Sequence, residues 1–281
     1  MKRDVIRRKA LAPKSTTDDY ESRDGGVQSV DRALSIIETL AEDDEGYRLS
    51  DLAIRTGLST STVHRLLATL ESRRFVQFDR TESKWHVGAR SFTVGATFAR
   101  RRNFTAQAIP YLRKLRDLTR ETANLAVVDD EFIVVLTRME SREIMRSLTK
   151  VGGRVAMVAS GVGKAVLATY SDEDVSAIIR HHGMPRLTEK SIVRPSDLFR
   201  ELERVRRQGY AVDDEEACIG LRCIAAVVYN DCSEPLAAIS VSGMTSRLTD
   251  DRLAALGQTV REVAAELTVA LGGVVPVMKP D

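Results

Sequence analysis

The segment that decides the fold, residues 49–72, reads LSDLAIRTGLSTSTVHRLLATLES. Leu49 and Leu52 fall on one side of a first predicted helix, for which Ser50 is the candidate N-cap. Gly57 follows where the chain must turn sharply, because glycine adopts a positive φ at little cost. The pattern predicts two short helices joined by a tight turn.

A second helix is expected from Ser59, a good N-cap, to Ser72. Its apolar residues follow the i, i+3, i+4, i+7 spacing that buries one helix face. These residues are Val63, Leu66, Leu67 and Leu70. The other face carries hydroxyl and basic groups near the N-terminal end, the end of a recognition helix that enters the major groove of DNA. The candidate DNA-contacting residues are Ser59, Thr60, Ser61, Thr62, His64 and Arg65.

The chemistry of this face suits duplex DNA. Short hydroxyls can bond phosphates and base edges, and a helix N-terminus favours an anion. The Arg65 guanidinium can reach a guanine edge or a phosphate. Taken alone, the segment is also compatible with an ordinary pair of surface helices, since such pairs are common.

Two β-rich runs, residues 75–79 and 84–87, follow at once and enclose a polar turn. Their pattern predicts a hairpin. A helix-turn-helix followed by a hairpin is a winged helix, which favours the DNA-binding interpretation. Arg80 and Lys84 lie where the tip of the wing would touch the phosphate backbone, whereas Trp85 is expected to pack against the hairpin.

Length and charge agree with this interpretation. A chain of 281 residues indicates about two domains. Residues 1–102 contain 19 lysines and arginines against 15 aspartates and glutamates, and the rest contains 23 against 25. The N-terminal part therefore leans towards a polyanion, and this mild bias supports DNA binding without specifying it.

The sequence also argues against several locations. No apolar run approaches the ~18 residues of a membrane span. Residues 1–8 are basic but lack the apolar stretch of a secretory signal. Three cysteines do not make a disulfide framework. We therefore expect a cytoplasmic protein with no membrane partner.

Composition shifts divide the chain into five parts. The expected order is a disordered arm (1–26), a winged helix-turn-helix domain (27–90), a linker helix (91–104), a second domain (105–274) and a C-terminal tail (275–281). Pro110 is expected to kink a helix or to lie in the first turn of a new one.

The second domain alternates strand and helix patterns. Strands are expected at 125–128, 131–137, 144–148, 210–212, 223–229 and 236–241. Helices are expected at 163–170, 172–181, 197–208 and 250–271. Hairpins first, helices in the middle and hairpins again predict an α+β domain with an antiparallel sheet.

Four polar pieces of this domain could form a small pocket. Residues 160–163 open a helix with free N–H groups, and Asp213 ends a short strand. Cys223 begins another strand, and Ser240 and Ser242 point to the same side of a third. Each piece also has a local structural explanation, such as a buried thiol or a hydroxyl bonded to nearby backbone.

Several motifs, in order, resemble the IclR family of bacterial transcription regulators over about residues 27–272. They lie at residues 29–38, 57–67, 87–88, 160–168, 213–216, 220–226 and 237–243. The resemblance implies a GAF-like or profilin-like effector domain and a ligand-responsive regulator that uses no cofactor. It also implies a homodimer through the N-terminal region or a tetramer through the sensor domains. A two-fold dimer would bind a near-palindromic duplex operator.

The resemblance further implies which residues contact an effector. They are Gly161, Val162, Asp213, Cys223, Ser240 and Ser242. Members with this pattern bind small 2-oxo acids such as glyoxylate or pyruvate. Relatives often have alanine where this chain has Val162, so the cavity should favour a very small acid. Asp213 would face an anion, which requires either a hydroxyl or hydrated carbonyl on the ligand, or protonation by burial.

The favoured function is a repressor that senses such an acid. An activator of the same family that senses another small or aromatic acid is the alternative. A thiol enzyme using Cys223 with His181 or His182 is less favoured, because no local signature surrounds the cysteine. A metal site is also disfavoured, since the spacings of Cys218, Cys223 and Cys232 are unlike those of zinc ligands.

Overall fold

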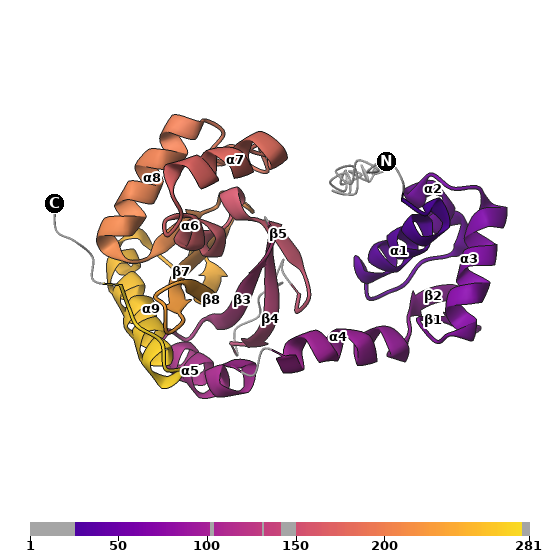
Figure 1. Cartoon of the computed structure of the whole chain (residues 1–281), viewed down its shortest axis with the longest axis horizontal. Coiled ribbons are helices and arrows are strands. Elements are labelled where there is room, and N and C mark those ends of the chain that lie inside the picture. Colours follow the sequence, from indigo (N-terminus) through magenta and orange to yellow (C-terminus); the bar gives the residue numbers. More distant parts are fainter. Residues whose placement is uncertain (1–25, 102–103, 131, 142–149, 277–281) are drawn as a thin grey trace, which may run out of the picture. The chain divides into compact units, whose positions relative to one another are not determined.

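The chain divides into two compact units between Phe98 and Ala99 in the computed structural model (Figure 1). The structure describes residues 26–101, 104–130, 132–141 and 150–276. The expected N-terminal arm, the predicted strand at 144–148 and most of the expected tail therefore lie outside the described residues. None of the described helices is long and apolar enough to cross a membrane.

The first unit is a three-helix fold with a two-stranded hairpin, and it contains the two helices, the tight turn and the hairpin that the sequence predicted. Its elements are α1 (Gln28–Ala41), α2 (Leu49–Thr56), α3 (Thr60–Ser72), β1 (Val76–Asp79), β2 (Lys84–Val87) and the start of α4 (Ala89–Arg101). Strands β1 and β2 are antiparallel. One apolar core joins α1, α2, α3 and the hairpin, and its buried members are Ile36, Leu40, Tyr47, Leu52, Val63, Leu67, Val76 and Trp85.

The turn between α2 and α3 follows the prediction, but the start of α2 does not. Gly57 ends α2 with φ +66°, the left-handed conformation that glycine adopts easily. Ser50 lies inside α2, whose N-cap is Arg48 without a side-chain cap. The helix begins early because Tyr47 forms a β-bridge with Trp85, which directs the chain straight into the helix.

The second unit is an antiparallel sheet with helices on both faces, which confirms the α+β class. The strands run in the order β5-β4-β3-β8-β7-β6. They are β3 (Thr122–Asp129), β4 (Phe132–Met139), β5 (Arg154–Ala156), β6 (Ala211–Asp214), β7 (Leu221–Tyr229) and β8 (Pro235–Met244). The helices are α5 (Phe104–Thr119), α6 (Gly161–Leu167), α7 (Asp172–His182), α8 (Pro195–Gln208) and α9 (Asp250–Ala270).

Alternation of side chains along the strands produces two cores. One core joins the sheet to α5 and α9, and the other joins the opposite face to α6, α7 and α8 (Figure 1). In β7, Ile224 and Ala226 face the first core, whereas Ala225 and Val227 face the second. This period of two decides which side of the sheet each polar side chain reaches.

Two local expectations differ from the structure. Pro110 lies in the interior of the continuous helix α5 and not in the first turn of a new helix, and the expected kink stays a prediction. Packing explains the difference, because Ala108, Leu112 and Leu115 of the same helix are fully buried against the sheet and hold it together. Strand β5 and a 3₁₀ turn at Met157–Ala159 were absent from the sequence-based expectation.

Candidate functional site

The N-terminal end of α3 is held by a compact network of hydroxyls. Ser59 caps the helix, and its Oγ accepts the N–H of Thr62 at 3.2 Å. The same Oγ lies 2.8 Å from Oγ1 of Thr62 and 3.1 Å from Oγ of Ser61. The predicted cap is confirmed, and it gives the start of the helix a fixed geometry.

The two faces of α3 divide as their polarity predicts. Val63 and Leu67 are fully buried in the core of the first unit. Thr62 is half-buried, and the remaining candidate residues are exposed: Ser59, Thr60, Ser61, His64 and Arg65. The structure thus brings the candidate DNA-contacting residues to one exposed helix end.

The tip of the wing offers one exposed cation and one that is already paired. Arg80 is exposed in the turn between β1 and β2. Nζ of Lys84 lies 3.1 Å from a carboxylate oxygen of Glu82 and 4.0 Å from one of Glu45. Trp85 is 8% exposed, in the core as expected. A contact between Lys84 and a phosphate would therefore compete with these carboxylates.

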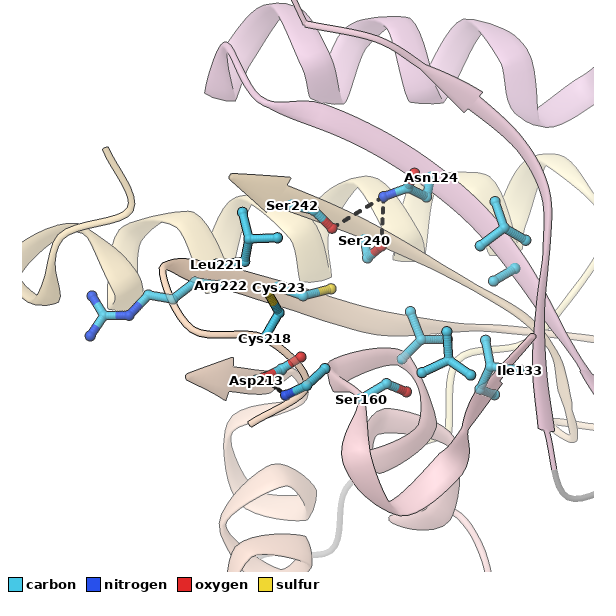
Figure 2. A pocket seen from close by; sticks show the side chains of 15 residues that line it. Asn124, Ile133, Ser160, Asp213, Cys218, Leu221, Arg222, Cys223, Ser240 and Ser242 are labelled. Atoms are coloured by element: carbon cyan, nitrogen blue, oxygen red, sulfur yellow. Dashed lines mark hydrogen bonds between the residues drawn. The ribbon is translucent and has the colours of Figure 1, made fainter. Parts of the chain in front are cut away.

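A cavity of about 110 Å³ lies in the second unit between the sheet and the start of α6 (Figure 2). It is small compared with drug-sized pockets of roughly 300–1,000 Å³. Its polar lining consists of Asn124, Ser160, Asp213, Cys218, Arg222, Cys223, Ser240 and Ser242. Its apolar lining consists of Ala126, Ile133, Val135, Val155, Val162, Ala217 and Leu221.

Strand register explains why polar residues from distant segments meet here. Asp213 of β6 pairs with Cys223 of β7, and Cys223 pairs with Ser242 of β8. These three residues form one row across neighbouring strands, which lie ~4.8 Å apart. Ser240 of β8 pairs with Asn124 of β3 two positions along, on the same face.

Asn124 is the main residue that the sequence analysis missed. Its Nδ2 lies 3.3 Å from Oγ of Ser240 and 3.3 Å from Oγ of Ser242 (Figure 2). It is the single polar residue in the run from Ala123 to Val128. A lone polar residue in an apolar run is a signal that the sequence offers, but the predicted strand began at Leu125, three residues after the observed start at Thr122, and so left Asn124 out.

The Asp213 carboxyl faces the cavity, and burial and hydrogen bonding shift its pKa in opposite directions. Its Oδ1 accepts the backbone N–H groups of Glu216 at 2.7 Å and Ala217 at 3.3 Å. Burial, helped by the nearby Glu216 carboxylate, raises the pKa of Asp213 to about 6. The carboxyl is therefore mostly ionised at neutral pH, yet much easier to protonate than an exposed aspartate.

The geometry around Cys223 argues against a thiol nucleophile. Burial raises the pKa of this thiol to about 11, so it is neutral at physiological pH. Neither His181 nor His182 lines the cavity; both lie on α7, where their rings contact each other. Within the described residues, no group of three or more potential ligands could hold a metal ion.

The first turn of α6 forms another part of the cavity wall. Oγ of Ser160 caps the helix by accepting the N–H of Gly163 at 3.0 Å. Val162 lines the cavity, whereas Gly161 does not: a Cβ there would meet the carbonyl oxygen of Cys223 at 2.9 Å. Of the six predicted effector residues, the structure thus brings five to the cavity, and Gly161 packs behind one of them.

Comparison with protein-family models covers both units. The model described as the IclR helix-turn-helix domain matches residues 29–80. The model described as the bacterial transcriptional regulator IclR C-terminal domain matches residues 96–269. The family therefore spans both the helix end and the cavity described above.

Individual relatives agree. The chain is 41% identical to the acetate operon repressor of Salmonella typhimurium over 251 residues, which cover 89% of this chain and 92% of the relative. It is 40% identical to the transcriptional repressor IclR of Escherichia coli, with the same coverage.

Solved structures extend the likeness to the fold. An IclR regulator from Alicyclobacillus acidocaldarius has a TM-score of 0.73 and 25% identity, over 88% of this chain and 100% of that one. Family models, relatives and fold lead to one conclusion. The chain belongs to the IclR family of DNA-binding bacterial transcriptional regulators.

Proposed function

We propose that this regulator is a repressor whose operator affinity responds to a small 2-oxo acid, such as glyoxylate or pyruvate, bound in the cavity. The observation that carries the proposal is the cluster of Asn124, Ser240 and Ser242 opposite Asp213 in a space of about 110 Å³. The similar proteins named as repressors support the sign of the regulation.

The cluster favours a ligand rich in hydrogen-bond acceptors. Each serine Oγ accepts from the Asn124 amide, so its own hydrogen remains for donation towards the cavity. Two such donors suit a carboxylate, and hydrogen bonds to a charged group contribute about 1.5–3 kcal/mol each.

Asp213 adds a second requirement. Because it is mostly ionised near pH 7, it repels a carboxylate and accepts a hydrogen bond from a hydroxyl. A hydrated carbonyl supplies such a hydroxyl next to the carboxylate. We therefore place the carboxylate at the serines and the hydrated carbonyl at Asp213.

A homodimer fits the DNA-binding role. It would place two recognition helices about one turn of DNA apart, ~34 Å, on a near-palindromic operator. Apolar side chains on the described part of the first unit support an interface there, because Val30 and Leu34 of α1 are 55% and 52% exposed and Phe92 of α4 is 79% exposed.

Two measurements test the proposal. In a thermal-shift screen, glyoxylate or pyruvate should raise the unfolding midpoint, whereas 4-hydroxybenzoate, which a 23%-identical homologue from Microbacterium hydrocarbonoxydans holds in its crystal, should not. In a gel-shift assay with the chain's own promoter region, the stabilising acid should change the affinity. A larger shift with 4-hydroxybenzoate would overturn the ligand assignment, and no salt-sensitive promoter binding would overturn the operator assignment.

A further inference from the structure

Lys164 is a charged side chain with no exposure at all, on a helix whose other residues are glycine or apolar. Its Nζ donates to the backbone carbonyl of Val212 at 2.6 Å and forms an ion pair with the carboxylate of Glu216. Oε1 of Glu201 lies 3.7 Å away. An ammonium in the interior costs several kcal/mol in lost hydration, so a role beyond packing is worth seeking.

The two main partners of Lys164 bracket Asp213. Val212 precedes Asp213 directly, and Glu216 donates its N–H to Oδ1 of Asp213 at 2.7 Å. One cation therefore holds the chain on both sides of the aspartate. The turn that presents the carboxyl to the cavity is fixed from behind by Lys164.

Lys164 is also fixed to the part of the cavity wall that the start of α6 forms. Its backbone N–H donates to the carbonyl of Ser160 at 2.9 Å, and both Ser160 and Val162 line the cavity. The wall formed by α6 and the wall formed by the Asp213 turn are thus joined through one buried side chain. Glu216, 52 positions away in the sequence, completes the connection.

We propose that Lys164, with Glu216, is a positioning residue that fixes Asp213 against α6 and so sets the affinity of the cavity for its ligand. The proposal rests on the proposed function, because it assumes a ligand in this cavity. Lys164 does not line the cavity and acts only through Asp213 and its turn.

Electrostatics gives the pair a second effect on Asp213. The Glu216 carboxylate raises the pKa of Asp213, and the Lys164 ammonium lowers it. From β7 and the preceding loop, Cys223 and Cys218 contribute thiols whose own pKa values are raised. Oε2 of Glu216 is buried without a hydrogen-bond partner among the described residues, so its charge depends strongly on Lys164.

The test replaces Lys164 and Glu216 together, because removing one would leave the other buried and unpaired. Glu201 keeps its ion pair with Arg204 at 3.0 Å. In the full-length protein, Lys164→Met with Glu216→Leu should keep the unfolding midpoint near that of the wild type and leave ligand-free operator binding unchanged. Glyoxylate affinity, measured by titration calorimetry, should fall at least tenfold. The control is Lys114→Met with Glu266→Leu, an exposed pair at 2.6 Å, which should leave glyoxylate affinity unchanged.

A cycle with Asp213→Ala separates positioning from general damage. In that background the double replacement should change glyoxylate affinity less than twofold, since its target is gone. A tenfold loss in both backgrounds would overturn the proposal, and so would wild-type affinity in the double variant. If the double variant does not fold, Glu216→Gln takes its place, because the Gln amide oxygen can still accept a hydrogen bond from the Lys164 ammonium. At least a threefold loss is then expected only where Asp213 is present.

The ligand assignment fails separately. If wild-type protein binds neither glyoxylate nor pyruvate, the proposed function is overturned together with this inference. If the wild type binds and the double variant binds equally well, only the positioning role of Lys164 is overturned.

Discussion

Asp213 and Ser242 face the same cavity from strands that are not neighbours, because both pair with Cys223 on the strand between them. This row places an acceptor at one end of the cavity and a hydroxyl donor at the other. Burial makes the Cys223 thiol neutral, so the middle of the row adds no charge. The site is therefore polarised along the row, and a ligand must match it in orientation.

Replacing Ser242 by alanine should weaken glyoxylate binding about tenfold or more. The change removes a hydroxyl that can donate to a carboxylate, a contact of about 1.5–3 kcal/mol. Calorimetric titration measures the loss, and operator affinity without ligand should stay unchanged. Ser246→Ala, an exposed serine in the same unit, is the matched control. Equal affinities for wild type and Ser242→Ala would exclude this hydroxyl as a contact.

Asp213 should make the free energy of unfolding depend on pH. Its pKa is raised from 3.8 to about 6 in the folded state, so the native carboxyl binds its proton more tightly than the unfolded one. Stability from this group is complete below about pH 4 and is lost as pH rises through about 6, in total about 3 kcal/mol. The Asp213→Asn variant has no carboxyl to ionise and so does not show this loss. The unfolding free energy of the variant minus that of the wild type should therefore increase from pH 4 to pH 7.

Urea denaturation at several pH values measures that difference. Asn keeps an oxygen that can accept the N–H groups of Glu216 and Ala217, which makes the pair of proteins comparable. Asp197→Asn, at the exposed start of α8, controls for a general change of charge. A pH-independent difference between wild type and Asp213→Asn would contradict the raised pKa.

Arg65 should contribute directly to operator recognition. If its exposed guanidinium reads a base, Arg65→Ala weakens operator binding by about 1–3 kcal/mol and relaxes preference at one position. Fluorescence anisotropy with operator and scrambled duplexes measures both effects. Arg186→Ala, an exposed arginine of the second unit, is the control. An unchanged operator affinity would remove Arg65 from the contacts.

Much of this picture follows from sequence periodicity. The spacing of Val63 and Leu67 predicted the buried face of α3, and the parity of Ser240 and Ser242 predicted a shared side of β8, because both depend on local geometry alone. The start of α2 was wrong because the Tyr47 bridge to Trp85, 38 positions away, decides it. Local patterns carry no information on such distant pairings.

The cavity also combines features that local sequence predicts with features that only the fold reveals. A glycine-rich helix start at residues 160–163 is visible in the sequence, and α6 begins there, whereas the cap by Ser160, which occupies the Gly163 N–H, is seen only in the structure. The buried ion pair between Lys164 and Glu216 could not be predicted, since a lysine in a helix is ordinarily expected to be solvated. Its burial becomes evident only once the strand order brings the Asp213 turn under α6.

The ion pair between Glu82 and Lys84 should weaken the binding of the wing to DNA. The two side chains form an ion pair at 3.1 Å, which competes with any phosphate for the ammonium. Glu82→Gln should therefore strengthen duplex binding severalfold and steepen its salt dependence by up to about 0.9 in the log–log slope, the value for one added phosphate contact. Glu189→Gln, an exposed change in the second unit, matches the charge difference. An unchanged slope would mean that Lys84 does not reach DNA.

Val162 should set the upper size of the ligand. It lines the cavity while being only 7% exposed, so its methyl groups occupy space that a longer acid would need. Val162→Ala should cost about 1 kcal/mol or more in unfolding free energy, because it leaves an enlarged void. The ratio of the affinity for pyruvate to the affinity for glyoxylate should rise, since the smaller alanine leaves room for the methyl group that pyruvate has and glyoxylate lacks. Competition titrations at one pH measure the ratio.

The control is Val151→Ala, at an exposed valine of the same unit, which should leave this affinity ratio unchanged. An unaltered ratio in Val162→Ala would show that another part of the lining limits the size of the ligand.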